Sequence, residues 1–234
     1  PVVQVKNYEG KTSQENDLSA GTIYDGPLAV LTSRVSASAS EIFAAAIQDY
    51  KRGLVVGEQS FGKGTVQNVL SLQRWIPKEE ERLGQLKLTI AKFYRVNGGS
   101  TQNEGVTPDL KLPSVYDEST VGESTYPNAL PYDQIPSSKY NTVEFINDDL
   151  IAVLRSKYED RIKSDKDLQD LIAEAQRMRE EKKKTAISLN EEARREQMAE
   201  NEKRRPARPE VEGELESLES GAPQPKALEI SDVY

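Results

Sequence analysis

The stretches Leu28-Ala-Val-Leu-Thr32, Val35-Ser-Ala-Ser-Ala-Ser-Glu-Ile42 and Leu54-Val-Val56 decide the fold class of this chain. The first and the third are short apolar runs, which predict two buried strands. Residues Ser40–Tyr50 lie between them and are apolar almost all round, which predicts a buried helix. A strand, a turn, a helix and a second strand in this order are typical of a parallel α/β unit.

The remaining core elements follow from the alternation of apolar and polar residues. Residues 65–72 alternate and predict a further strand, and residues 85–96 predict a longer one. We expect Pro113 to close the globular part, so that residues 1–113 form the core. Residues 114–140 carry Pro, Ser, Tyr and Asp without periodicity, and we expect a connecting loop there.

A helical extension is predicted for residues 141–205. Its first helix, Asn141–Tyr158, is expected to begin at a capping box that starts with Asn141, and a second helix is expected to be capped by Ser164. Ser188-Leu-Asn-Glu191 is a further capping signal, before a very polar third helix. In residues 206–234 Pro and Glu dominate, which predicts a disordered tail.

The 234 residues carry a formal net charge of −8. Nucleic acid is therefore not an expected partner, because neutralising phosphates requires clustered Lys and Arg. The short basic spots at Lys182–Lys184 and Arg204–Arg205 fit solvated helix faces. No apolar run approaches the roughly 20 residues that span a bilayer.

Histidine and cysteine are absent from the chain. Their absence excludes disulfides, thiolate metal sites, a cysteine nucleophile and a Ser–His–Asp triad. Nucleophilic chemistry would need a serine that is activated by another base. Lysine is the next candidate, because burial lowers the pKa of an ammonium group. We expect no cofactor and no metal.

Ser38 is the candidate nucleophile, and two interpretations apply to it. In the first, Ser38 is the N-cap of the predicted helix and Glu41 completes a capping box. In the second, the strand-to-helix turn exposes the Ser38 hydroxyl, and the helix N-terminus offers N–H groups to a developing oxyanion. The two interpretations are compatible, and only the second needs a base nearby.

Lys63 is the candidate base, and it lies between two glycines in Gly57-Glu-Gln-Ser-Phe-Gly-Lys-Gly-Thr65. Glycines allow close backbone packing, which would place the ammonium group in a confined site. A structural salt bridge and a nucleotide-binding P-loop are the alternatives. A P-loop needs Ser or Thr directly after the lysine and then a helix. Here Gly64 follows the lysine, and the pattern from Thr65 is that of a strand.

Gln67 and Asp49 are the remaining polar candidates. Lys63 and Gln67 share one face of a strand, so the Gln67 amide is either an orienting group for the lysine or a solvated strand residue. Asp49 lies near the end of the predicted helix, where an acid is unfavourable for the helix dipole. We expect Asp49 to form a salt bridge, for example with Lys51 or Arg52.

Three motifs occur together in the core. The first is Ser36-Ala-Ser-Ala-Ser-Glu-Ile-Phe-Ala-Ala-Ala46, and the second is Phe61-Gly-Lys-Gly-Thr-Val-Gln67. The third is Phe93-Tyr-Arg-Val-Asn-Gly-Gly-Ser-Thr-Gln102 with Gly105-Val-Thr-Pro-Asp109. The spacing from Ser38 to Lys63 is 25 residues. This combination closely resembles the C-terminal processing proteases, and most closely their tail-specific branch. The resemblance covers residues 26–113, and the helical extension is also similar to that branch.

The resemblance implies an α/β fold in which a partial serine-protease core precedes an α-helical C-terminal extension. The core would consist of a strand, a nucleophile turn, a helix, a strand and further β-strands. The resemblance also implies a serine endopeptidase with a Ser–Lys dyad, in which Ser38 is the nucleophile, Lys63 is the general base and Gln67 positions the lysine. The backbone N–H of Ala39 would serve as an oxyanion donor, and Asp49 would support the structure.

The family's upstream parts are not among these 234 residues. They comprise a Gly-rich turn with the second oxyanion donor, a PDZ domain that captures substrate C-termini, and an N-terminal helical part. We therefore expect the 234 residues alone to be poorly active.

The resemblance also implies a substrate class and a location. The substrates would be proteins with apolar or unfolded C-terminal tails. The location would be periplasmic, or membrane-associated on the periplasmic side of a bacterium. The alternative is a protein-binding or assembly module that is catalytically dead by truncation, whose helical extension docks an adaptor or another copy of the chain.

Overall fold

The computed structural model describes residues 1–19, 21–75, 83–117 and 119–204. The chain divides into two units, residues 1–183 and residues 184–234. The described part of the first unit contains a three-stranded and a four-stranded sheet. In sequence, one α-helix lies among their strands, and the other described α-helices follow the last strand.

The three-stranded sheet has the order β3-β4-β7 and is parallel. Its strands are β3 (Ala29–Thr32), β4 (Leu54–Gly57) and β7 (Leu110–Lys111). Helix α1 (Ala39–Asp49) connects β3 to β4. The α/β fold predicted from the strand–turn–helix–strand pattern is therefore confirmed.

Helix α1 is buried on one face only. Its buried residues Ala44 and Ala45 form the core together with Val55 and Val106, and Val30 packs against them. Phe43 is 53% exposed. The prediction of a helix buried all round is therefore wrong within this chain, because the small alanine face is the one that packs on the parallel sheet.

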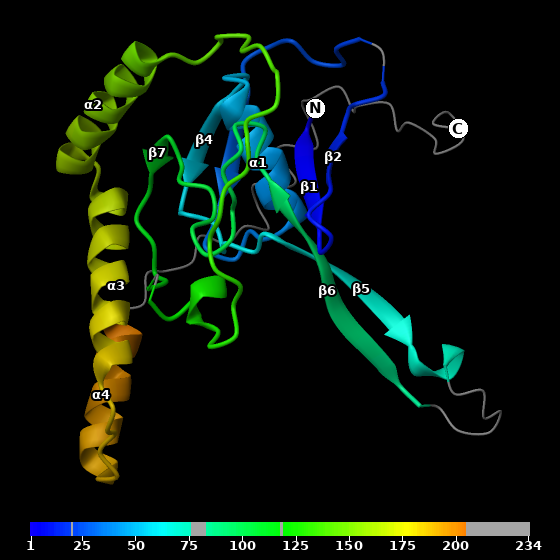
Figure 1. Cartoon of the computed structure of the whole chain (residues 1–234). Coiled ribbons are helices and arrows are strands. Elements are labelled where there is room, and N and C mark those ends of the chain that lie inside the picture. Colours follow the sequence, from blue (N-terminus) through cyan, green and yellow to red (C-terminus); the bar gives the residue numbers. More distant parts are fainter. Residues whose placement is uncertain (20, 76–82, 118, 205–234) are drawn as a thin grey trace, which may run out of the picture. The chain divides into compact units, whose positions relative to one another are not determined.

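The four-stranded sheet is antiparallel and has the order β2-β1-β6-β5. Strands β5 (Thr65–Ser71) and β6 (Gln85–Tyr94) fall where alternation predicted strands. They pair as a long hairpin that extends away from the parallel sheet (Figure 1), and the short 3₁₀ helix Leu72–Arg74 follows β5. Strands β1 (Val3–Asn7) and β2 (Thr12–Glu15) were not predicted.

The segment 114–147, between Pro113 and α2, has little regular structure but is hydrogen-bonded to the core. Its only regular element in the described part is the short 3₁₀ helix Glu123–Thr125. The backbone N–H of Ile135 donates to the Gly98 carbonyl at 3.0 Å, and that of Ser138 donates to the Val96 carbonyl at 2.9 Å. The globular part therefore continues past Pro113, where the sequence pattern predicted only a connection.

The helical extension consists of α2 (Asp148–Ser164), α3 (Lys166–Lys183) and, in the second unit, α4 (Glu191–Arg204). The predicted start of the first helix at Asn141 is wrong. The N-cap is Asn147, whose side chain accepts the Leu150 N–H at 2.8 Å. The preceding residues instead pair with the end of α1, where the Val143 N–H donates to the Tyr50 carbonyl at 3.0 Å.

The later caps also differ from the prediction. Ser164 ends α2, and the Asp165 carboxylate accepts the Leu168 N–H at the start of α3. Asn190 caps α4 by accepting the Ala193 N–H at 3.0 Å. The predicted tail, residues 206–234, lies outside the described residues. Within the described ranges, no helix has the length and apolar character needed to cross a membrane.

Candidate functional site

Ser38 lies in the turn between β3 and α1 and is the N-cap residue of α1. Its backbone has φ 59° and ψ −112°. Residues with a side chain rarely adopt this conformation, and such strain persists only where the surroundings enforce it. Ala39 is the first helical residue, so its N–H has no acceptor within the helix. The turn therefore places a serine hydroxyl at the positive end of a helix.

Glu41 joins this turn to the segment that carries Lys63, and it is fully buried. Its Oε2 atom accepts the backbone N–H groups of Ser38 at 2.8 Å and of Lys63 at 2.9 Å. Its Oε1 atom accepts the Ser60 hydroxyl at 2.5 Å and the Gly62 N–H at 2.7 Å. Because one oxygen accepts both N–H groups, the backbones of Ser38 and Lys63 lie close together.

The ionisation of Glu41 reflects this environment. Burial raises the pKa of its carboxyl above 4.5, and hydrogen bonds from Ser60, Gly62, Ser38 and Lys63 counteract part of that rise. Three of the four donors are backbone N–H groups, which can only donate, and the fourth is the Ser60 hydroxyl. The carboxylate form, which only accepts, can take all four of these hydrogen bonds.

The Lys63 segment packs closely against residues 102–103. The Asn103 N–H donates to the Gly62 carbonyl at 2.7 Å, and the Gly64 N–H donates to Oε1 of Gln102 at 2.9 Å. Gly62 has a φ of +95°, and a Cβ at Gly64 would lie 2.7 Å from the Gln102 backbone nitrogen. Both positions therefore need glycine.

Lys63 lines a pocket of about 540 Å³. Thr65 and Gln67 line the same pocket, as expected for alternate residues on one strand face. The Gln67 amide lies 3.5 Å from the Thr89 hydroxyl, at the limit of a hydrogen bond. The segment after Lys63 is strand β5 and not a helix, so a P-loop is excluded.

Asp49 at the end of α1 has a partner that is distant in sequence. Its carboxylate accepts two hydrogen bonds from the Arg95 guanidinium, at 2.6 and 3.1 Å, and one from the Asn97 amide at 2.9 Å. The partners of Asp49 are therefore Arg95 and Asn97, just after β6, and not the expected Lys51 or Arg52. Asp49 fastens α1 to the antiparallel sheet.

Asp49→Asn is expected to lower the free energy of unfolding by about 3 kcal/mol, because the Asp49 side chain is only 5% exposed and Arg95 would lose its charged partner. Urea unfolding followed by circular dichroism measures this loss. If the midpoint of unfolding did not move, the pair would be structurally unimportant.

If Ser38 and Lys63 act as the family resemblance implies, Glu41→Gln in the full-length protein is expected to lower kcat/KM roughly 10- to 100-fold. The glutamine amide nitrogen would face N–H donors at either oxygen position, and a hydrogen bond to a charged group is worth about 1.5–3 kcal/mol. The control is Asp49→Asn, which changes another buried carboxylate on the same helix. Peptidase assays compare the two variants at a temperature where both stay folded. Equal rates for the two variants would mean that Glu41 acts on stability alone.

The sequence pattern indicated Glu41 only as part of a capping box, and it indicated no role for Gln102 within the motif that ends there. The signal for Glu41 was a carboxylate in the first turn of a helix that packs on a sheet. Gln102 carried no local signal, because its partner Gly64 is 38 residues away. No group of three or more acidic side chains in the described part of the chain is arranged to hold a metal ion.

Comparison with known proteins adds to this geometry. Residues 1–112 match peptidase family S41, and residues 116–227 match the C-terminal domain of tail specific protease. A tail-specific protease of Haemophilus influenzae is 43% identical over 205 residues, which are 87% of this chain and 29% of that protein. A carboxy-terminal-processing protease of Bartonella bacilliformis is 44% identical over 115 residues, covering 46% of this chain and 25% of that protein.

Among solved structures, a photosystem II D1 C-terminal processing protease is 33% identical, with a TM-score of 0.36, over 50% of this chain and 28% of that chain. The chain has an α/β fold in which a strained serine lies between a parallel strand and a helix, and its sequence matches place it among the peptidases. Within that class, the chain belongs to the C-terminal processing proteases of peptidase family S41, in the tail-specific branch. It spans less than a third of the length of the two curated relatives.

Proposed function

We propose that this chain carries the catalytic residues of a serine endopeptidase that uses a Ser–Lys dyad. The observation that carries the proposal is the Glu41 carboxylate, one oxygen of which accepts the N–H groups of both Ser38 and Lys63. This contact fixes the backbone of the nucleophile against the backbone of the base. The strained conformation at Ser38 supports the same assignment, since such strain clusters at active sites.

The reaction is an acyl transfer. The neutral Lys63 amine takes the proton of the Ser38 hydroxyl, and the Ser38 oxygen attacks the peptide carbonyl. Lysine returns the proton to the leaving amine, and a water molecule then hydrolyses the acyl-enzyme. The Ala39 N–H, at the start of α1, stabilises the oxyanion together with the helix dipole. Gln67, in the same pocket, orients the lysine.

The proposed substrates are proteins that present apolar or unfolded C-terminal tails; the names of two relatives, a tail-specific protease and a carboxy-terminal-processing protease, support cleavage near a C-terminus. A location on the periplasmic side of a bacterium stays a prediction. The docking of an adaptor or a second copy of the chain through the helical extension also stays a prediction. Fractionation of cells and size-exclusion chromatography test them.

A fluorophosphonate probe tests the proposal directly. In the full-length protein, the probe is expected to modify Ser38, as mapped by mass spectrometry, and to block casein cleavage in proportion to labelling. Labelling of any other serine together with loss of activity would assign the nucleophile elsewhere. A protein that neither labels nor cleaves would favour the alternative of a binding module.

A further inference from the structure

The pocket around Lys63 has a wall that comes from a distant part of the sequence. Residues 121–135, called the strap below, follow the peptidase match and lie within the region that matches the C-terminal domain. The strap residues that line the pocket are Glu123, Tyr126, Asn128, Ala129 and Leu130. They face a second group of lining residues from the core, which includes Phe61, Lys63 and Gln67.

The front of the strap is anchored to Arg34, four residues before Ser38, and to Phe61, two residues before Lys63. Arg34, in the turn that leads to Ser38, is buried and donates to the Val121 carbonyl and to the Ser60 carbonyl, each at 2.6 Å. The Glu123 N–H donates to the Phe61 carbonyl at 3.0 Å. A Cβ at Gly122 would collide with the Arg34 guanidinium, so the chain passes close to this anchor.

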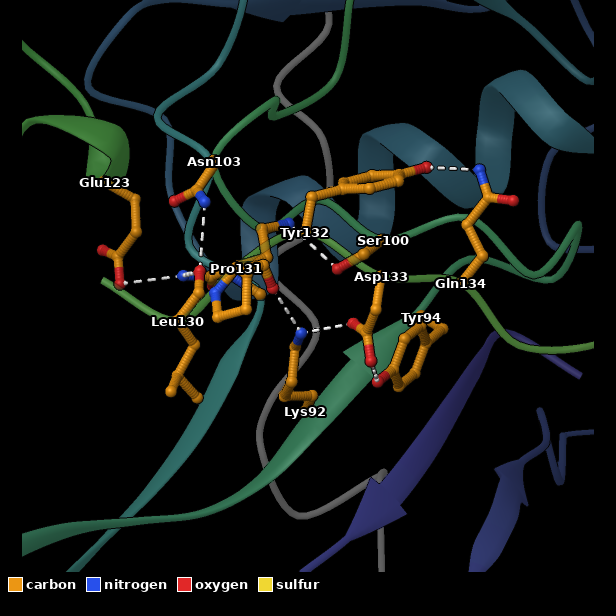
Figure 2. Close-up of polar contacts among 12 residues, drawn as sticks. Lys92, Tyr94, Ser100, Asn103, Glu123, Leu130, Pro131, Tyr132, Asp133 and Gln134 are labelled. Atoms are coloured by element: carbon orange, nitrogen blue, oxygen red, sulfur yellow. Dashed lines mark hydrogen bonds and ion pairs between the residues drawn. The ribbon is translucent and has the colours of Figure 1, made fainter. Parts of the chain in front are cut away.

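The rear of the strap is anchored on β6 and on the loop that follows it (Figure 2). The Asn103 amide donates to the Leu130 carbonyl at 3.0 Å. The Lys92 ammonium donates to the Pro131 carbonyl at 2.7 Å and pairs with the Asp133 carboxylate, which also accepts the Tyr94 hydroxyl at 3.0 Å. The pocket wall is therefore held from both ends.

Gln102 links the two ends of this wall to the Lys63 segment, and it is fully buried. Its Oε1 accepts the Gly64 N–H, next to Lys63. Its Nε2 donates to the Leu130 carbonyl at 3.0 Å, and lies 3.4 Å from the Glu123 carboxylate. One side-chain amide thus fixes the distance between the wall and the candidate base, as a preformed binding pocket requires.

The apolar surface of the pocket is available to a ligand. Tyr126 is 54% exposed and Leu130 is 41% exposed. The Tyr126 ring lies with its centroid 6.4 Å from that of Phe61, across the junction between the strap and the core. Figure 2 shows the Leu130 side chain directed to the opposite side from Tyr132, which lines a separate cavity with Arg95.

We propose that the strap forms the specificity wall of the active site. Tyr126 and Leu130 contact the substrate side chain that lies next to the scissile bond, and they set the largest apolar residue that fits. The C-terminal domain thus takes part in substrate selection. This inference rests on the proposed function, since it assumes that Lys63 acts beside the scissile bond.

The test uses the full-length protein and quenched peptides that differ only in having Ala, Leu or Phe on one side of the scissile bond. Leu130→Ala enlarges the pocket and is expected to raise the Phe-to-Ala ratio of kcat/KM by about 10-fold or more, since one methylene group in an apolar pocket is worth roughly 10- to 200-fold. Leu130→Trp fills the pocket and is expected to lower the same ratio by a similar factor. Tyr126→Ala is expected to act like Leu130→Ala.

Tyr132→Ala is the matched control for Tyr126→Ala. It also removes a tyrosine ring from the strap, but Tyr132 lines the cavity with Arg95 and not the Lys63 pocket. Its ratio is expected to equal that of the unaltered protein, and fluorophosphonate labelling counts competent sites in each preparation. Opposite shifts for Leu130→Ala and Leu130→Trp support the proposal, because strap loosening would move both variants in one direction. If the unaltered protein cleaves the peptides and the ratios do not move, the strap proposal fails alone. If it cleaves none of them, the proposed function fails and the strap proposal fails with it.

Discussion

Replacing Ser38 by alanine in the full-length protein is expected to lower kcat by about 10⁴-fold or more, since the nucleophile is lost and no other covalent route remains. The fold should survive, because a lost N-cap costs only about 1 kcal/mol. Casein cleavage and the cleavage of quenched peptides measure the rate, and thermal unfolding checks the fold.

Ser40→Ala is the matched control for this change. Ser40 is the second residue of α1, two positions after Ser38, and is exposed; its hydroxyl donates only to the Ala37 carbonyl at 2.9 Å. Its activity should therefore stay close to that of the unaltered protein. Turnover by a clean Ser38→Ala preparation, or an equal loss in Ser40→Ala, would contradict the assignment of Ser38 as nucleophile.

The sequence predicted those parts of the fold whose pattern is local. The apolar runs before and after the alanine-rich helix became β3 and β4, and the alternation after Gly64 became β5. The strap could not be predicted in this way, since its order comes from side chains such as Gln102 and Lys92 that bind its carbonyl groups from afar.

The candidate site shows the same division. Ser38, Lys63 and Gln67 stood in recognisable motifs, and the structure brings the backbones of the first two together through Glu41. The role of Glu41 could not be derived from a capping pattern alone, because three of its four donors lie 19 to 22 residues further along the chain. Likewise, Asp49 pairs with Arg95, 46 residues away, and not with its basic neighbours.

Replacing Lys63 by arginine is expected to reduce peptidase activity as strongly as replacing it by alanine. Arginine keeps the positive charge, but it cannot lose its proton at working pH and so cannot accept one from Ser38. A salt-bridging lysine would tolerate the exchange at least in part. The rates of the two variants therefore separate a base from a structural cation.

Lys157→Arg, an exposed position on α2, is the matched control and should keep full activity. A small primary amine in the assay gives a second measurement, because it can enter the space left in Lys63→Ala and accept the serine proton. The rate of Lys63→Ala should rise with the concentration of the neutral amine, whereas Lys63→Arg, whose side chain still fills that space, should respond little. If Lys63→Arg kept a large share of activity, or if amines restored nothing to Lys63→Ala while both proteins stayed folded, a group other than Lys63 would have to take the proton from Ser38.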